Sequence, residues 1–204
     1  MAIERPNPAD TEALELASRS GWPEDLRVLI SRFPREQWAG HANLGEMARF
    51  WLSRHDMFRE LSGNIEQVTT EFRNGALPAT EFPRHLVPRL QFMLSQLDVH
   101  HQIEDRHYFP IFRAAEERLA RGFDVLEGDH HAIHADMAAT AETANALLRA
   151  LADKTDIRQP GDDYAAASGA LIKGLIRHLD DEEDLIVPLI LDRGEAALGV
   201  AHHG

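Results

Sequence analysis

The fold is decided by the stretch His100-His101-Gln102-Ile103-Glu104-Asp105-Arg106-His107-Tyr108-Phe109-Pro110, which places a histidine and a carboxylate four residues apart. Four residues of α-helix turn through about 400° and rise about 6 Å, so His100 and Glu104 point the same way. The same order returns in residues 178–188, which again have His first, Glu fifth and Pro eleventh. One such match is weak, but two in register favour a pair of helices that carry matched metal ligands.

Composition limits the class of protein and the kind of metal site. A chain of 204 residues with 44% hydrophobic content suits one domain with a sizeable core. The net charge of -13 opposes binding to phosphate backbones and to anionic lipid surfaces, so we expect neither a nucleic acid nor a membrane as partner. Without cysteine, the chain has no disulfide, iron–sulfur cluster or thiolate zinc site, so any metal must bind to His, Asp or Glu.

The N-terminal residues Met-Ala-Ile-Glu-Arg-Pro-Asn-Pro have neither a basic start nor an apolar run. No stretch of the chain approaches 18 consecutive apolar residues. We therefore expect a cytoplasmic protein.

Apolar residues recur every three or four positions in four long segments, which is typical of amphipathic helices. The predicted helices cover residues 42–72, 83–110, 123–152 and 164–192, with a helical connector at 111–121 and a loop at 153–163. Shorter helices are expected at 11–18 and 23–31. The predicted fold is all-α, an antiparallel up-and-down four-helix bundle at 41–195, with a helical extension at 1–40 and a flexible tail at 196–204.

Each predicted helix carries polar side chains on its apolar stripe. They are His55, His100, Glu104, His130, His134, His178 and Glu182. A lone histidine on an apolar face is more often a hydrogen-bonded core residue than a ligand. Seven such side chains in one layer would form a costly, poorly satisfied core without a metal. The pattern therefore predicts a metal site.

These residues resemble the hemerythrin-like family, the HHE cation-binding domains, over roughly residues 40–195. The family order is a single His, then His-x3-Glu, then His-x3-His, then His with a carboxylate four or five residues on. By this resemblance one iron takes His130, His134 and His178, the other takes His55 and His100, and Glu104 and Glu182 bridge them. The implied cofactor is a non-haem pair of Fe ions with a bridging oxo or hydroxo group and one open position.

The choice of bridging carboxylate stays open at one place. Glu183 competes with Glu182, because oxygen-carrying members of the family use a five-residue spacing to Asp. Glu182 is preferred since it repeats the spacing of His100 and Glu104. Asp105 and Glu183 are then expected to be outer partners of the ligands or solvated.

Three further histidines lie beside the pattern. His101 and His131 point about 100° away from their neighbours and are expected on the flanks of their helices. His107 takes the position that Leu185 has in the second stretch, and it is a candidate outer donor or tuning group, with ligand status the less favoured choice.

The leading hypothesis is a non-haem di-iron protein that binds or senses oxygen, nitric oxide or iron. Trp51 and Phe58 lie one turn either side of His55, which would suit a small neutral gas as partner. The alternatives are a di-iron peroxidase or nitric oxide reductase, and a structural bundle that binds zinc or no metal. Manganese in place of iron and a homodimer stay open.

Overall fold

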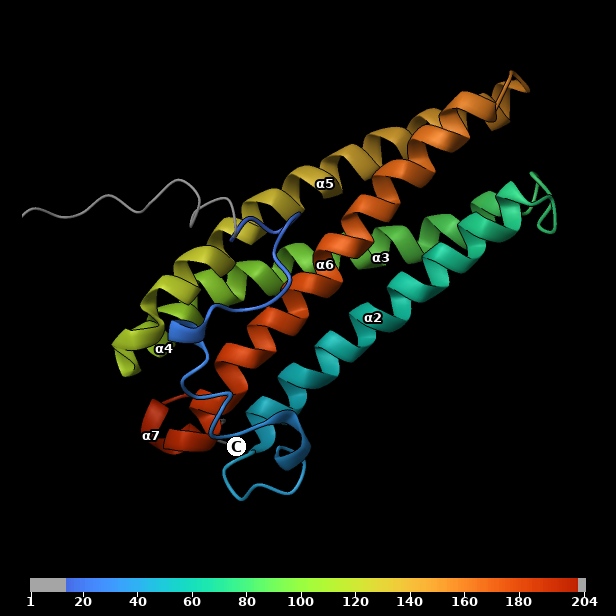
Figure 1. Cartoon of the computed structure of the whole chain (residues 1–204). Coiled ribbons are helices and arrows are strands. Elements are labelled where there is room, and N and C mark those ends of the chain that lie inside the picture. Colours follow the sequence, from blue (N-terminus) through green and yellow to red (C-terminus); the bar gives the residue numbers. More distant parts are fainter. Residues whose placement is uncertain (1–13, 202–204) are drawn as a thin grey trace, which may run out of the picture. The chain divides into compact units, whose positions relative to one another are not determined.

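The structure is a computed structural model that describes residues 14–201, where every regular element is helical. The elements are η1 (Glu24–Leu26), η2 (Arg35–Gln37), α2 (Glu46–Arg73), α3 (Phe82–Ile103), η3 (Glu104–Tyr108), α4 (Phe109–Ala115), η4 (Glu117–Leu119), α5 (Ala120–Asp153), α6 (Arg158–Arg193) and α7 (Glu195–Leu198) (Figure 1). The predicted all-α helical bundle is confirmed. Among these described helices, none has both the length and the apolar character needed to cross a membrane.

The chain divides into two compact units, which are described separately. Unit 1 comprises Met1–Leu52, Asp105–His130 and Arg177–Gly204, and unit 2 comprises Ser53–Glu104 and His131–Ile176. The four places where the chain passes from one unit to the other lie close in sequence to the predicted ligands.

Unit 2 consists of four helical segments, one from each of the long helices α2, α3, α5 and α6. The end of α2 and the start of α3 are joined by the turn at 74–81 (Figure 1). Phe82 stacks on Phe72 with a centroid separation of 4.1 Å and meets the edge of Tyr164 at 6.3 Å. These aromatic contacts join α2, α3 and α6 at one end of unit 2. This end is distant in sequence from the predicted ligands.

Unit 1 has its own hydrophobic core, and the N-terminal segment belongs to it. Trp22, Leu26, Leu29 and Trp38 are buried in one cluster with apolar residues of α6 such as Leu185. Burying an aromatic or leucine side chain contributes about 1.5–3 kcal/mol, so this segment is held by more than surface contacts.

The N-terminal extension differs from the prediction in its local structure. Residues 14–18 lie in turns, and the rest of the predicted helix at 11–18 lies outside the described residues. The predicted helix at 23–31 is replaced by the three-residue helix η1 and successive turns, with hydrogen bonds such as Arg27 N–H to the Glu24 carbonyl. Helices this short have little stability of their own, so tertiary contacts decide the backbone path.

The second long helix, predicted to run to Pro110, is interrupted before that residue. Helix α3 ends at Ile103, and residues 104–108 form the π-helical turn η3 before α4 begins at Phe109. Proline has no N–H to donate to the carbonyl four residues earlier, and its ring crowds that carbonyl. The helix therefore takes a wider, π-helical turn just before Pro110. Pro188, at the matching position, lies inside the uninterrupted helix α6.

Two further boundaries differ from those predicted. Helix α6 begins at Arg158 rather than Tyr164, because Asp156 Oδ1 accepts the N–H of Arg158 at 3.0 Å and Pro160 is tolerated in the first turn. At the C-terminus, where a flexible tail was predicted for 196–204, α7 forms and Leu198 and Val200 are buried. Residues 202–204 lie outside the described part.

Helix α5 approaches α6 closely at one glycine of unit 1. A Cβ on Gly122 would lie 2.5 Å from Cδ1 of Leu185, which is 1% exposed, whereas a Cβ on Gly128 would meet nothing within 4 Å. We predict that Gly122→Ala is less stable than Gly128→Ala by about 1–3 kcal/mol, because overpacking opposes the gain in helix propensity that both share. Urea unfolding of the two variants measures this difference. Equal stabilities would contradict the close packing.

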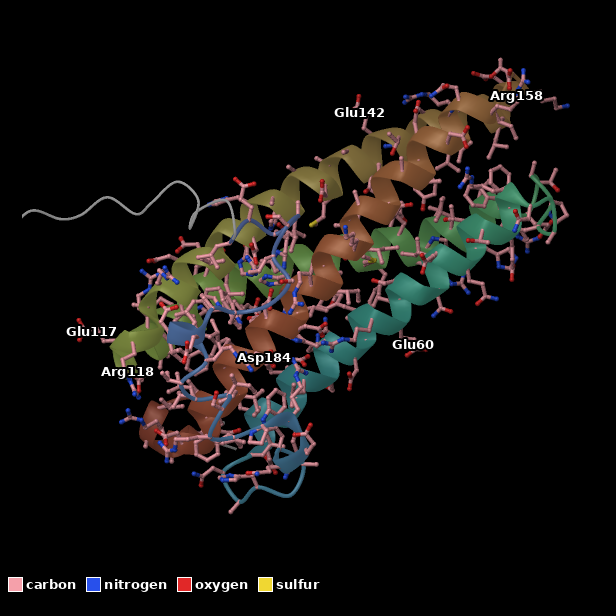
Figure 2. All side chains as sticks on the ribbon, in the orientation of Figure 1. Glu60, Glu117, Arg118, Glu142, Arg158 and Asp184 are labelled. Carbon is pink, nitrogen blue, oxygen red and sulfur yellow. The ribbon has the colours of Figure 1, made fainter. Side chains whose placement is uncertain are left out.

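A second test of unit 1 concerns Glu116, which is buried before η4. Arg118 Nε donates to its carboxylate at 2.7 Å and Arg193 Nη2 donates at 3.1 Å. The hydrogen bonds from Arg118, aided by Arg193, lower the pKa of Glu116 from the usual 4.5 to about 2. Arg118 and the neighbouring Glu117 are labelled in Figure 2.

Because the pKa of Glu116 is lower in the folded state, its contribution to stability is present above about pH 4.5 and is lost as the pH falls towards 2. We predict that Glu116→Gln lowers the free energy of unfolding at pH 7 by about 1 kcal/mol, and that the difference shrinks by pH 3. Glu117→Gln, at the exposed neighbour, is the matched control. If both variants behave alike at both pH values, the assignment is wrong.

Candidate metal centre

Unit 2 brings three of the predicted ligands together in its interior. His55 comes from α2, His100 from α3, and Glu104 is the first residue of the π-helical turn. The Nε2 atoms of His55 and His100 are 3.2 Å apart, and His100 Nε2 is 3.0 Å from Glu104 Oε1. His55 and Glu104 are fully buried, and His100 is nearly so. Their candidate ligand atoms all lie within 4.8 Å of one another.

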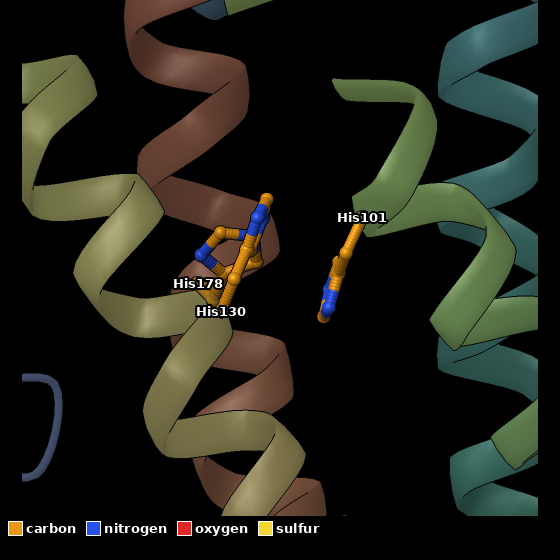
Figure 3. A group of neighbouring side chains, drawn as sticks. All are labelled: His101, His130 and His178. Carbon is orange, nitrogen blue, oxygen red and sulfur yellow. The ribbon is translucent and has the colours of Figure 1, made fainter. Parts of the chain in front are cut away.

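Unit 1 contains a second set of the same composition. His130 is on α5, and His178 and Glu182 are on α6. The Nε2 atoms of the two histidines are 3.1 Å apart, and His178 Nε2 is 3.5 Å from Glu182 Oε2. Figure 3 shows the two imidazole rings close together beside the ribbons of α5 and α6. All three side chains are buried.

The spacing of the nitrogen atoms in each set fits a shared cation. Metal–imidazole bonds are about 2.0–2.1 Å long, so two of them at about 90–110° place their nitrogen atoms roughly 2.8–3.4 Å apart. The observed separations of 3.2 Å and 3.1 Å fall in this range. Two imidazoles and one carboxylate per set are suitable donors for a divalent transition metal, and the fit requires no other residue type.

Carboxylates hold the outer nitrogen atoms of both histidines in unit 1. His130 Nδ1 is 2.7 Å from Asp105 Oδ1, and His178 Nδ1 is 3.3 Å from Asp129 Oδ2. A carboxylate that accepts from Nδ1–H fixes the tautomer, so Nε2 keeps its lone pair for a metal. Asp105, which follows Glu104 in the π-helical turn, thus has the outer role that was one of its two predicted alternatives.

Asp129 and its partner Arg19 were missed by the sequence analysis. Burial alone would raise the pKa of Asp129, but hydrogen bonds and charges from His178 and Arg19 outweigh it and hold that pKa below its usual value. Asp129 lies three residues after the core residue Leu126, so its spacing could have indicated burial. Arg19 lies in an irregular segment, and nothing in the sequence marks it.

Two histidines differ from their predicted positions. His134, a predicted ligand, has a side chain that is 39% exposed, with Nδ1 3.8 Å from Asp98 Oδ1. His101, predicted on the flank of its helix, is fully buried, and its ring centroid is 5.3 Å from that of His134. The flank prediction for His101 is wrong because Leu97, four residues earlier, already marks that face of α3 as buried. Figure 3 also labels His101 on α3.

Contacts and burial within unit 1 also bear on the choice between Glu182 and Glu183 and on the role of His107. Glu183 Oε2 accepts a hydrogen bond from Arg35 Nη1 at 2.7 Å, whereas Glu182 lies beside His178. His107 is exposed in the π-helical turn, so its burial does not support a role as a metal ligand. His131 is exposed, in agreement with its predicted flank position.

These features define a class of protein: an all-α protein that buries His and Glu clusters able to hold a metal. The model of the hemerythrin HHE cation binding domain matches residues 46–198, which is more than half of the chain. The chain therefore belongs to this family of cation-binding domains. No significant match was found among the curated proteins or the solved structures.

The contrast between His101 and His134 can be tested directly. We predict that His101→Gln lowers metal content and affinity more than His134→Gln, because a buried imidazole is better fixed as a ligand than a part-exposed one. Metal analysis and competition with a chelator measure both quantities on the folded variants, and His131→Gln serves as the exposed control. A larger loss in His134→Gln would restore His134 as the ligand.

Proposed function

We propose that this chain is a non-haem di-iron protein that binds or senses oxygen, nitric oxide or iron. The observation that carries the proposal is two pairs of buried imidazoles, with Nε2 atoms 3.2 Å and 3.1 Å apart, each with a buried glutamate beside one of its histidines. Sets of two histidines and one carboxylate are typical of non-haem ferrous sites. The proposed ligands are His55, His100 and Glu104 in unit 2 and His130, His178 and Glu182 in unit 1, with His134 and His101 as further candidates.

The donor type favours iron over structural zinc. Structural zinc sites are usually four-coordinate, closed and built with cysteine, which this chain lacks. Each set here offers three protein donors, whereas an iron ion prefers more, so positions remain for further donors and for a small ligand. Glu104 and Glu182 are the proposed carboxylate donors of their sets.

The surroundings of the donor sets favour a small neutral ligand. In unit 2 the ring of Phe58, which is fully buried, lies 5.2 Å from the ring of His100. In unit 1 the ring of Phe109 stacks 5.3 Å from that of His130. Apolar rings beside the ligands offer few polar partners to a larger, hydrogen-bonding substrate, whereas oxygen and nitric oxide need none. The cytoplasmic location stays a prediction.

The bound irons would supply reversible electron transfer to the gas, and the chain's own residues would position them and exclude water. The test is anaerobic loading with ferrous iron, iron analysis, and an optical spectrum before and after oxygen or nitric oxide is admitted. We predict about two irons per chain and a visible charge-transfer band that disappears when oxygen is removed.

Variants in each donor set sharpen this test. His100→Ala and His178→Ala should each reduce the iron content towards about one per chain, because each removes one imidazole from a set of three donors. His107→Ala, at an exposed histidine outside both sets, is the matched control. Little iron, or zinc in its place, would contradict the di-iron proposal. Two irons with prompt irreversible oxidation would favour the peroxidase or reductase alternative.

A further inference from the structure

We propose that Arg19, in the N-terminal segment, is a positioning residue for the metal ligand His178, and that it acts through Asp129. Arg19 lies outside residues 46–198, which the HHE domain match covers. The inference rests on the proposed function in one respect, since it takes His178 as a metal ligand. It links the docking of the N-terminal segment to metal binding.

The guanidinium of Arg19 is enclosed between two carboxylates. Its side chain is fully buried, with Nη1 3.2 Å from Asp129 Oδ1 and Nη2 bonded to Asp129 Oδ2. On its other side, Nε donates to Asp181 Oδ2 at 2.7 Å. A two-point contact between Arg and a carboxylate fixes the orientation of the carboxylate as well as its distance. Arg19 therefore determines where the oxygen atoms of Asp129 lie.

Asp129 transmits this orientation to the ligand. The oxygen Oδ2 that bonds to Arg19 Nη2 also lies 3.3 Å from His178 Nδ1. A proton held on Nδ1 leaves the lone pair on Nε2, the atom that lies 3.1 Å from His130 Nε2. Removing Arg19 would leave Asp129, which is 3% exposed, without this counter-charge, so the carboxylate would have to move or admit water. His178 would then lose its fixed tautomer.

The rest of the N-terminal segment is attached to the same stretch of α6. Trp22 Nε1 donates to the carbonyl of Asp181 at 2.7 Å. Arg35 donates to Glu183 and to the carbonyl of Asp180, at 2.7 Å and 2.8 Å. The segment thus contacts the helix just after His178 through three side chains. If metal binding favours one orientation of His178, it must by reciprocity favour the docked segment as well.

The experiment compares the full-length variants Arg19→Gln, Arg19→Lys, Asp129→Asn and Arg35→Gln. Arg35→Gln is the matched control, because it removes an arginine that joins the same segment to the same helix but does not contact Asp129. Competition between the protein and a chromophoric chelator for ferrous iron gives the metal affinity. We expect roughly a 10- to 100-fold loss for Arg19→Gln and less than about 3-fold for Arg35→Gln.

A second readout needs no metal. Histidine-selective ¹⁵N NMR of the metal-free chain reports the tautomer of His178, which should be protonated on Nδ1 in the parent chain and mixed in Arg19→Gln and Asp129→Asn. If Arg19→Gln does not fold, Arg19→Lys, which keeps the charge but loses the two-point contact, should show an intermediate loss of affinity and a partly mixed tautomer.

The two readouts separate this inference from the proposed function. A chain that binds no iron but has an Arg19-dependent His178 tautomer would contradict the di-iron proposal and leave the positioning role supported. If Arg19→Gln and Arg35→Gln lose the same affinity and the tautomer is unchanged, the positioning role is overturned. In the double variant Arg19→Gln, Asp129→Asn, we expect no further loss beyond Asp129→Asn alone.

Discussion

The arrangement depends on the burial of acidic side chains beside imidazoles. Glu104 and Glu182 are fully buried, and each lies beside the histidine four residues before it. Removing a carboxylate from water costs several kcal/mol unless positive charge and hydrogen bonds compensate. A divalent cation bound between the imidazole nitrogens would provide that charge, and the clusters could hold one.

The second constraint is the density of charge on α6 in unit 1. Between residues 177 and 184 this helix carries one arginine, one histidine and five acidic residues, and most of them are buried. A helix that is buried on several faces must find partners for its polar groups on each of them. Here His178 contacts His130 and lies beside Glu182, while Asp181 and Glu183 accept hydrogen bonds from arginines of the N-terminal segment. One helix thus serves both the ligand set and the segment.

Helical spacing was enough to predict much of this chain. The repeat of His and Glu four residues apart predicted that His100 and Glu104 lie together, as do His178 and Glu182, and both pairs are found as neighbours. Spacing could not predict the π-helical turn, because the effect of Pro110 depends on how the backbone before it relaxes. It also could not predict Arg19, whose contacts with Asp129 and Asp181 join positions 110 and 162 residues apart.

The central claim is that each compact unit supplies one ion with two imidazoles and a glutamate. The most direct measurement is a crystal structure of the iron-loaded chain with anomalous scattering recorded at the iron absorption edge. The account predicts one iron peak within bonding distance of His55, His100 and Glu104, and another beside His130, His178 and Glu182, with Nε2 as the bonded atom in each histidine. A single peak, or iron bound through exposed residues such as His107, would contradict it.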